Sequence, residues 1–231
     1  TGLNTPRNFD IEISDEIALL TGLPFRSAPN KFSLMASHDG LVHSMSQLRN
    51  LAVALLKIVN DLRLLSCGPR SGFSELQLPK NEPGSSMMPG KVNPTQCEAM
   101  AMVCTQIMGF DSAVAMAGSG GHLQMNVYKP LIAFNLLHSI ELLHDACKSC
   151  RLNMIEGIEP NKPRIKHGLE QSLMLVTALV PAIGYDKACE IANYAHTKIL
   201  SLREAATELG YISQEEFDRI LDPSSMTSPN S

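Results

Sequence analysis

One run of apolar residues constrains the fold of this chain more than any other feature. Between residues 41 and 62, apolar side chains recur in alternating steps of four and three, at Leu41, Met45, Leu48, Ala52, Leu55, Val59 and Leu62. This spacing puts them on one stripe of an α-helix and is typical of a seam between packed helices. A second stripe consists of Leu51, Ile58 and Leu65, so we expect the helix to contact neighbours on more than one side.

The predicted helix runs from Ser37 to Ser66 and would be about 45 Å long at a rise of roughly 1.5 Å per residue. A chain of 231 residues rarely needs so long a helix for its own core, so we expect partner chains to share it. Two further long helical patterns occupy residues 95–116 and 130–155, and no segment alternates convincingly as a strand. We therefore predict an all-α fold built on a bundle of long helices.

A change of pattern near residue 160 predicts two domains. Residues 1–159 are expected to form a central helical-bundle domain, and residues 160–231 a small helical C-terminal domain made of shorter helices. The tail from Asp222 to Ser231 has no apolar face, and we expect it to be disordered.

Local signals in the second domain indicate where its helices begin and end. Gly184 and Gly210 each follow a helical pattern, and glycine is favoured just past a helix C-terminus because it tolerates positive φ. Ser213 is followed three residues later by Glu216, the spacing of a capping box. We expect a helix to begin directly after Ser213.

The charge balance argues against two classes of partner. The formal net charge is −4 and the sequence pI is near 6.0, whereas binding to nucleic acid or to an anionic membrane surface needs a basic footprint. The most apolar stretch, Leu173 to Tyr185, is interrupted by Pro181 and Gly184 and is too short to span a bilayer. No secretory signal pattern is present in this sequence.

Cysteine and histidine spacing gives no support for a metal centre or a disulfide framework. The six cysteines lack the regular spacing of a disulfide scaffold, which predicts a reducing compartment. Cys147 and Cys150 form a CxxC, but no second pair of ligands follows at similar spacing, so we interpret them as thiols carried by a helix. The seven histidines show no HExxH pattern.

A long loop separates the first two long helices. It runs from Cys67 to Asn93 and is rich in Gly, Pro, Ser and charged residues, and ordered loops of this length on a rigid frame usually carry function. Its end, residues 82–94, combines glycines that allow close backbone approach with hydroxyl, ammonium and amide groups that can hold a carboxylate. On composition alone, an anion site and an ordinary polar loop remain alternatives.

The order of residues in that loop resembles the signature of the fumarase/aspartase superfamily. The pattern Gly-Ser-Ser-x-Met-Pro-x-Lys-x-Asn is complete from Gly84 to Asn93. The continuation Pro94-Thr-Gln-Cys-Glu-Ala-Met100 is similar to class II fumarate hydratases in particular, as are residues 1–5, 28–32, 170–179 and 184–188. The chain thus resembles the C-terminal half of that family, with a fumarase-type bundle.

This resemblance implies reversible trans addition of water to fumarate, giving (S)-malate, with no metal or organic cofactor. Ser85 would be the base that removes a proton from malate. Lys91 and Asn93 would bind the carboxylate that accumulates charge, since fixed donors stabilise an aci-carboxylate, and Ser86 and Val92 would contact substrate beside them. Glu98 would orient a catalytic histidine, although an acid at a helix start is also favoured by the helix dipole.

The resemblance also implies what this chain lacks. The catalytic histidine, with a threonine and a Ser-Ser-Asn cluster, belongs to a segment N-terminal to Thr1, and family members assemble homotetramers whose sites draw on three subunits. We therefore expect a truncated chain that is inactive alone, from a cytoplasmic or mitochondrial-matrix enzyme. Gln124 and Lys80 depart from the usual glutamates of the family, and we expect both changes to be tolerated.

Two other functions stay open. The first is another lyase of the superfamily, such as aspartase, argininosuccinate lyase or adenylosuccinate lyase, which share the loop but release an amine. The second is a non-catalytic helical scaffold of the kind found among lens crystallins. The residues Thr95-Gln-Cys-Glu98 favour a fumarase over the other lyases, and the intact Ser85, Lys91 and Asn93 argue against loss of catalysis.

Overall fold

The computed structural model describes residues 1–82, 84 and 87–227. The chain divides into two compact units, one made of Thr1–Cys67 and Leu78–Glu159, the other of Gly68–Gln77 and Pro160–Ser231. One boundary between the units lies between Glu159 and Pro160, and the segment Gly68–Gln77 belongs to the second unit. Whether these units are separate folding domains stays a prediction.

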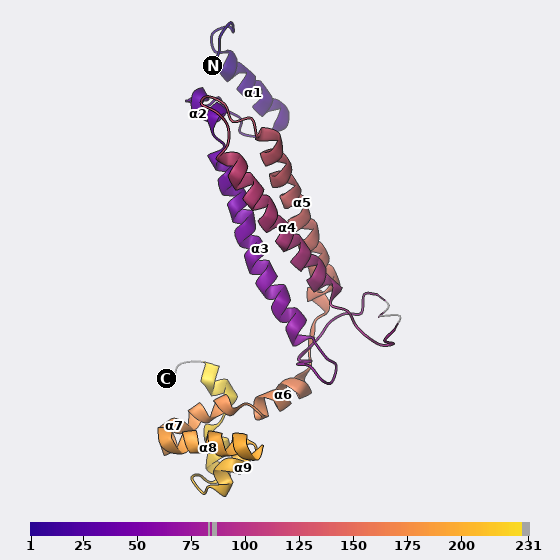
Figure 1. The fold of residues 1–231 in the computed structure, drawn as a ribbon, viewed down its shortest axis with the longest axis vertical. Helices are drawn as coiled ribbons and strands as arrows, with labels where there is room; N and C mark the ends of the chain where they lie inside the picture. Colours follow the sequence, from indigo (N-terminus) through magenta and orange to yellow (C-terminus); the bar gives the residue numbers. More distant parts are fainter. Residues whose placement is uncertain (83, 85–86, 228–231) are drawn as a thin grey trace. The chain divides into compact units, whose positions relative to one another are not determined.

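Three long helices form the body of the first unit, α3 (Asp39–Leu65), α4 (Thr95–Gly118) and α5 (Lys129–Asn153), which lie side by side (Figure 1). Two shorter helices precede them, α1 (Phe9–Thr21) and α2 (Lys31–Ala36), and a 3-10 turn, η1 (Ile155–Gly157), follows α5. The prediction of an all-α bundle is confirmed, and all three long helices fall within three residues of their expected bounds.

The predicted seam of α3 is the line along which this bundle packs. Met45, Ala52 and Val59 are between 0% and 2% exposed, and Leu48, Leu55 and Leu62 pack partly buried against the same core. Their partners on α4 include Met100 and Ile107; the remaining buried core of this unit consists of Cys97, Cys104, Val114, Ala117, Ile132, Leu136, Leu143, Cys150 and Met154. Burial of this apolar stripe is the main source of stability for α3.

The second stripe of α3 behaves differently. Leu51 and Ile58 are 46% and 50% exposed within this chain. The other long helices also expose large apolar residues, namely Met102, Met116, Phe134 and Leu137. Among the described residues, α4 also has the length and composition that would suffice to cross a membrane. Because α4 packs against both α3 and α5 in the bundle, we interpret it as a core helix.

Asn126 organises the turn between α4 and α5. Its buried side-chain amide donates to the carbonyl of Ala117 at 2.9 Å and its Oδ1 accepts from the backbone N–H of Tyr128 at 2.9 Å. Its backbone N–H donates to the carbonyl of Met35, and its own carbonyl oxygen lies 3.2 Å from Nε2 of His38. One residue therefore ties the end of α2 to the α4–α5 turn, a role that the sequence analysis missed.

The second unit is built from short helices around its own core. Its elements are α6 (Lys162–Glu170), η2 (Leu173–Leu179), α7 (Val180–Ile183), α8 (Tyr185–Lys198), α9 (Leu202–Glu208), α10 (Gln214–Ile220) and η3 (Pro223–Thr227). The buried core residues are Leu179, Ile191, Ala195, Leu202, Ala205, Ala206, Ile212 and Phe217. This arrangement agrees with the predicted small helical region.

Hydrogen bonds to the backbone carbonyls of residues 72–75 explain why residues 68–77 join this unit. The N–H of Asn161 donates to the carbonyl of Glu75 at 2.8 Å, its side-chain amide donates to Ser74 at 2.9 Å, and Arg164 donates to the carbonyls of Phe73 and Gly72. Two strands of two residues each, β1 (Leu76–Gln77) and β2 (Glu159–Pro160), form a small sheet. Such short strands show no alternation, so the sequence could not reveal them.

The helix ends match the predicted signals in part. Gly184 and Gly210 follow α7 and α9 with φ of 85° and 66°, as expected of glycines at helix C-termini. The side chain of Ser213 accepts from the N–H of Glu216 at 3.2 Å, which caps α10. The complete reciprocal capping box is formed instead at the start of α9, by Ser201 and Glu204.

The predicted disorder of the tail is wrong for residues 223–227, which form η3. Asp222 stabilises this turn, because its carboxylate accepts from the backbone N–H of Ser224 at 2.9 Å and from the Ser224 hydroxyl at 2.7 Å. These bonds also hold the pKa of Asp222 below its ordinary value. An Asp before Pro-Ser is a turn signal that a test for an apolar face does not detect. Residues 228–231 lie outside the described part.

Candidate functional site

The predicted substrate residues lie on the loop that enters α4. Lys91 and Val92 are exposed, Asn93 is half-buried, and the first turn of α4 begins two residues later at Thr95. The loop thus ends at the positive pole of a 24-residue helix, whose first N–H groups have no partner within the helix. Ser85 and Ser86, the predicted base and its neighbour, lie outside the described residues.

A tight turn shapes the end of the loop. The N–H of Lys91 donates to the carbonyl of Met88 at 3.2 Å, with Pro89 and Gly90 between them and Gly90 at φ 80°. Proline followed by a residue with positive φ is the signature of a type II turn. The Pro-Gly pair of the loop pattern therefore has a structural task, which is to reverse the chain just before Lys91.

Gly84 lies against the chain that leaves this turn. A Cβ atom on Gly84 would overlap the carbonyl oxygen of Lys91 and would also lie 3.1 Å from its carbonyl carbon. Only a residue without a side chain allows this approach. Gly84, the first residue of the signature, and Lys91 near its end therefore lie close together in space.

Glu98 lies in the first turn of α4 and pairs with a residue that the sequence analysis did not single out. The Nη2 of Arg63, in the last turn of α3, donates to Oε1 of Glu98 at 2.9 Å. Both side chains are partly exposed. Arg63 and Glu98 are 35 residues apart in sequence, and the signal that could have indicated Arg63 is its place as the basic residue at the end of the helix before the loop.

A shallow depression opens beside this pair. Its volume is about 450 Å³, and its walls are formed by Arg63 of α3 and by one face of α4, namely Glu98, Ala101, Met102, Thr105, Gln106 and Gly109. Thr105 and Gln106 are polar and Met102 is 68% exposed. An approaching group can therefore reach Glu98 along the face of α4 without disturbing the buried core.

The cysteines of the bundle are packed in the core rather than exposed for reaction. Burial raises the pKa of the Cys97 thiol to about 11, and the pKa values of Cys104 and Cys150 are raised for the same reason. Cys147 and Cys150 both lie on α5, as predicted for thiols carried by a helix. Within the described ranges, no group of three or more His, Cys, Asp or Glu side chains is arranged to hold a metal ion.

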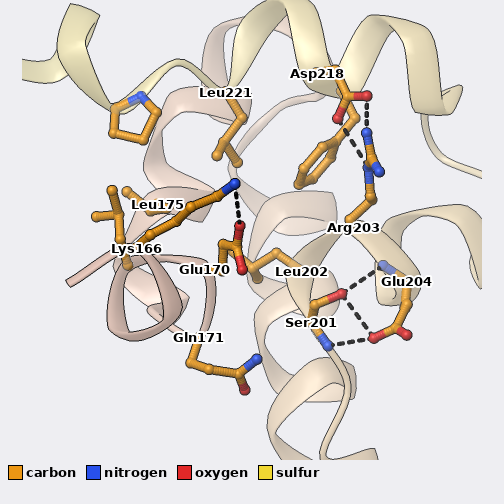
Figure 2. Close-up of a pocket in the computed structure, with 13 residues that line it drawn as sticks. Lys166, Glu170, Gln171, Leu175, Ser201, Leu202, Arg203, Glu204, Asp218 and Leu221 are labelled. Carbon is orange, nitrogen blue, oxygen red and sulfur yellow. Dashed lines mark hydrogen bonds and ion pairs between the residues drawn. The ribbon is translucent and has the colours of Figure 1, made fainter. Parts of the chain in front are cut away.

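A second cavity, of about 660 Å³, lies within the second unit (Figure 2). It has an apolar wall that includes Leu175, Leu202 and Leu221, and charged side chains around it. Most of those charges have partners: Arg203 pairs with Asp218, the Ser201 hydroxyl with Glu204, and Lys166 lies 3.8 Å from Glu170. None of the predicted site residues that the structure describes lines this cavity.

Comparison with known sequences identifies the class of protein that this fold and loop define. Residues 1–109 match the sequence family described as lyase, and residues 175–228 match the family described as fumarase C C-terminus. The first match includes the whole signature loop and Glu98. The chain belongs to the lyase superfamily that the loop pattern indicated.

Individual relatives narrow this further. The chain is 71% identical over 228 residues to the class II fumarate hydratase of Prochlorococcus marinus strain MIT 9313, a match that covers 99% of this chain and 49% of the relative. It is 54% identical over 226 residues to the mitochondrial fumarate hydratase of Dictyostelium discoideum, covering 98% of this chain and 47% of the relative. The chain is therefore similar over nearly its whole length to class II fumarate hydratases, and it spans about half the length of the relatives it matches.

A solved structure supports the same assignment. The crystal structure of a recombinant class II fumarase from Schistosoma mansoni matches all of this chain with a TM-score of 0.92 at 43% identity, and the match covers 51% of that structure. The bundle, the loop and the short helices that follow thus occur together in a class II fumarase. Neither of the two departures from the family pattern, Lys80 and Gln124, is buried.

Proposed function

We propose that this chain is part of an enzyme that catalyses the reversible trans hydration of fumarate to (S)-malate. The observation that carries the proposal is the complete signature from Gly84 to Asn93 in a chain 71% identical to a class II fumarate hydratase over 99% of its length. The loop ends at the N-terminus of α4, where backbone N–H groups and the helix dipole favour an anionic ligand.

The residues of the loop suit the chemistry of this reaction. Malate loses a proton from the carbon beside a carboxylate, which leaves an aci-carboxylate with additional negative charge. Lys91 supplies an ammonium and Asn93 an amide donor for that charge, and Val92 between them contacts the substrate. Ser85 acts as the base and Ser86 contacts the substrate beside it. A serine hydroxyl is a weak base, so its alkoxide-like form requires backbone N–H donors, to which glycines leave access.

Glu98 is proposed to act through a histidine rather than on the substrate. A carboxylate that pairs with one ring nitrogen of a histidine orients the ring and raises the basicity of the other nitrogen. The histidine belongs to a part of the enzyme that this chain does not contain. We infer that the chain corresponds to the C-terminal half of the enzyme, which the match of residues 175–228 to the C-terminus of fumarase C supports.

We further propose that the long helices associate into a homotetramer. The support is the apolar second stripe of α3, where Leu51 and Ile58 are about half exposed in the single chain, together with exposed Met102 and Phe134. Apolar surface of this extent on long helices is typical of association sites. Light scattering of the full-length protein should give four times the chain mass, and a monomer would contradict the proposal. The enzyme is expected in the cytoplasm or the mitochondrial matrix.

The activity is tested by two assays on the full-length protein. Fumarate hydration is followed by the loss of fumarate absorbance, and aspartate deamination by ammonia release, under the same conditions. We expect hydration and no deamination. Ammonia release without hydration would point to an aspartase-type lyase, and neither activity in a correctly assembled protein would point to a scaffold or to a superfamily lyase that releases a larger amine.

A further inference from the structure

We propose that Arg63 is a positioning residue for Glu98, so that the carboxylate is held in one orientation at the start of α4. This inference rests on the proposed function, because it assigns a partner to a residue of the same site. The observation behind it is the hydrogen bond from Nη2 of Arg63 to Oε1 of Glu98 at 2.9 Å.

The geometry leaves Glu98 able to act on a second group. The hydrogen bond from Arg63 engages Oε1 alone, and a carboxylate has a second oxygen that accepts independently. Glu98 also lines the open depression along the face of α4. Arg63 therefore holds one side of the carboxylate, and the other oxygen remains for a ring N–H that arrives from outside this chain.

The Arg63–Glu98 pair has an alternative, purely structural explanation, and a second ion pair between the same two helices provides a comparison. Arg63 and Glu98 could merely join α3 to α4. A second pair, Arg49 on α3 and Asp111 on α4, joins the same helices through a 3.0 Å contact from Nε. In that pair the acidic side chain is 19% exposed, against 40% for Glu98. Exposed pairs contribute little to stability, so as a structural link Arg49–Asp111 is at least as strong.

The two ion pairs differ in their position along α3. Arg63 is in the last turn of α3, at the start of the loop, whereas Arg49 lies 14 residues earlier in the same helix, about 21 Å along its axis. Loss of Arg49 should therefore report only on helix packing. Loss of Arg63 should report on packing and on the orientation of Glu98.

The charges around Glu98 determine the sign of the expected effect on pH dependence. On α3 the facing charge is Arg63. On α4 the Cys97 thiol interacts with Glu98, and on α5 Cys150 interacts with Cys97; burial raises the pKa values of both thiols. Near neutral pH the thiols are uncharged, so Arg63 is the cation that offsets the charge of Glu98. Removal of Arg63 favours the protonated form of the histidine that pairs with Glu98, and so raises the pKa of that histidine.

The experiment compares Arg63→Met with Arg49→Met in the full-length enzyme. We expect Arg63→Met to lower kcat roughly 10- to 100-fold, the usual effect of losing a residue that orients a catalytic ligand, with little change in KM. In fumarate hydration Ser85 gives its proton to carbon and the histidine takes one from water, so the acidic limb of the pH–rate profile for hydration should move to higher pH. Arg49→Met should keep kcat within about twofold and leave the limb in place, because surface substitutions remote from a site have small effects.

Further variants test whether Arg63 acts through Glu98. In a Glu98→Gln background, Arg63→Met should cause no additional loss of kcat, since two residues that act as a unit are not additive. Arg63→Lys should restore the position of the pH limb, because the charge returns, but only part of kcat, because lysine lacks the planar fork. If Arg63→Met fails to assemble, Arg63→Gln takes its place: a displaced limb supports the proposal, and a limb in the wild-type position overturns it.

The outcomes separate this inference from the proposed function. Wild-type protein without fumarate hydration would overturn the proposed function and with it this role. Active wild-type protein in which Arg63→Met matches Arg49→Met in kcat and in its pH profile would overturn the role of Arg63 alone.

Discussion

A side-chain carbon on Gly84 would overlap the carbonyl oxygen of Lys91. Gly84 is the first residue of the signature and Lys91 the eighth, and the type II turn from Met88 to Lys91 brings them together. The glycine at the head of the pattern is thus required by a backbone contact within the loop. This contact aligns the chain that carries the proposed substrate contacts.

The first prediction follows from this contact. Gly84→Ala should move the loop backbone and lower kcat/KM of the full-length enzyme by about 100-fold, since misplacement by about 1 Å has effects of that size. The melting temperature should change little, because the loop is exposed. Steady-state kinetics and thermal unfolding measure the two effects.

Gly40→Ala is the matched control for this substitution. Gly40 lies near the start of α3, and a Cβ atom there would meet nothing within 4 Å. Its replacement should leave kcat/KM unchanged. Equal activities for Gly84→Ala and wild type would show that the loop tolerates the displacement.

The second prediction contrasts Ser85 with Lys91. Ser85→Ala should lower kcat far more than it weakens substrate binding, because the base acts on a proton that moves only in the transition state. Lys91→Ala should damage both, because its ammonium meets the carboxylate in the ground state and again in the aci-carboxylate. Initial-rate kinetics with malate and a binding measurement with a substrate analogue distinguish the two patterns. Equal patterns would count against the proposed roles.

The third prediction concerns the 231-residue chain alone. It should show no measurable fumarate hydration, because the proposed catalytic histidine belongs to another part of the enzyme and general acid–base catalysis is typically worth about 10²–10⁴-fold. The assay uses purified chain with mass spectrometry to exclude full-length contaminant. Rapid hydration by the pure chain would mean that the active site has been misplaced.

The fourth prediction concerns alkaline pH. Burial raises the pKa of Cys97 from 9.0 to about 11 in the folded chain, so between pH 9 and 11 the unfolded state loses a proton that the folded state keeps. The stabilising contribution is complete below pH 9 and is lost as the pH rises through about 11. Urea midpoints of the full-length protein should therefore fall more steeply with pH for wild type than for Cys97→Ala.

Cys189→Ala is the control for this experiment, because the Cys189 thiol is exposed. Tyr194 and Tyr211 also have raised pKa values, caused by hydrogen bonds to Glu208 and Glu190. Both tyrosines are present in every variant, so their contribution cancels in the comparison. Identical pH dependence for Cys97→Ala and Cys189→Ala would rule out a contribution from the buried thiol.

The fifth prediction concerns the capping box of α9. The hydroxyl of Ser201 accepts from the N–H of Glu204 at 3.2 Å, and the Glu204 carboxylate accepts from the N–H of Ser201 at 2.8 Å. Ser201→Ala should lower the unfolding free energy of the second unit by about 1 kcal/mol. Ser201→Asp should retain most of it, as measured by urea denaturation. An unchanged midpoint for Ser201→Ala would mean that the cap contributes nothing.

What the sequence determined by itself is the local structure. The stripe through Met45, Ala52 and Val59 predicts both the extent of α3 and the side that is buried, because residues three and four positions apart share a helix face. The bounds of α4 and α5 followed from the same rule. The order of residues from Gly84 to Asn93 indicated the family through its resemblance to the superfamily signature, whereas the composition of the loop alone left an ordinary polar loop open.

Only the tertiary structure decided which distant residues meet. Arg63 and Glu98 are joined because α3 and α4 pack side by side, and residues 68–77 join the second unit because Asn161 binds their backbone. The approach of Gly84 to Lys91 likewise depends on a turn whose φ values the sequence only suggests. Periodicity reports the neighbours along one helix, whereas contacts between elements depend on how complete faces pack, which no short pattern contains.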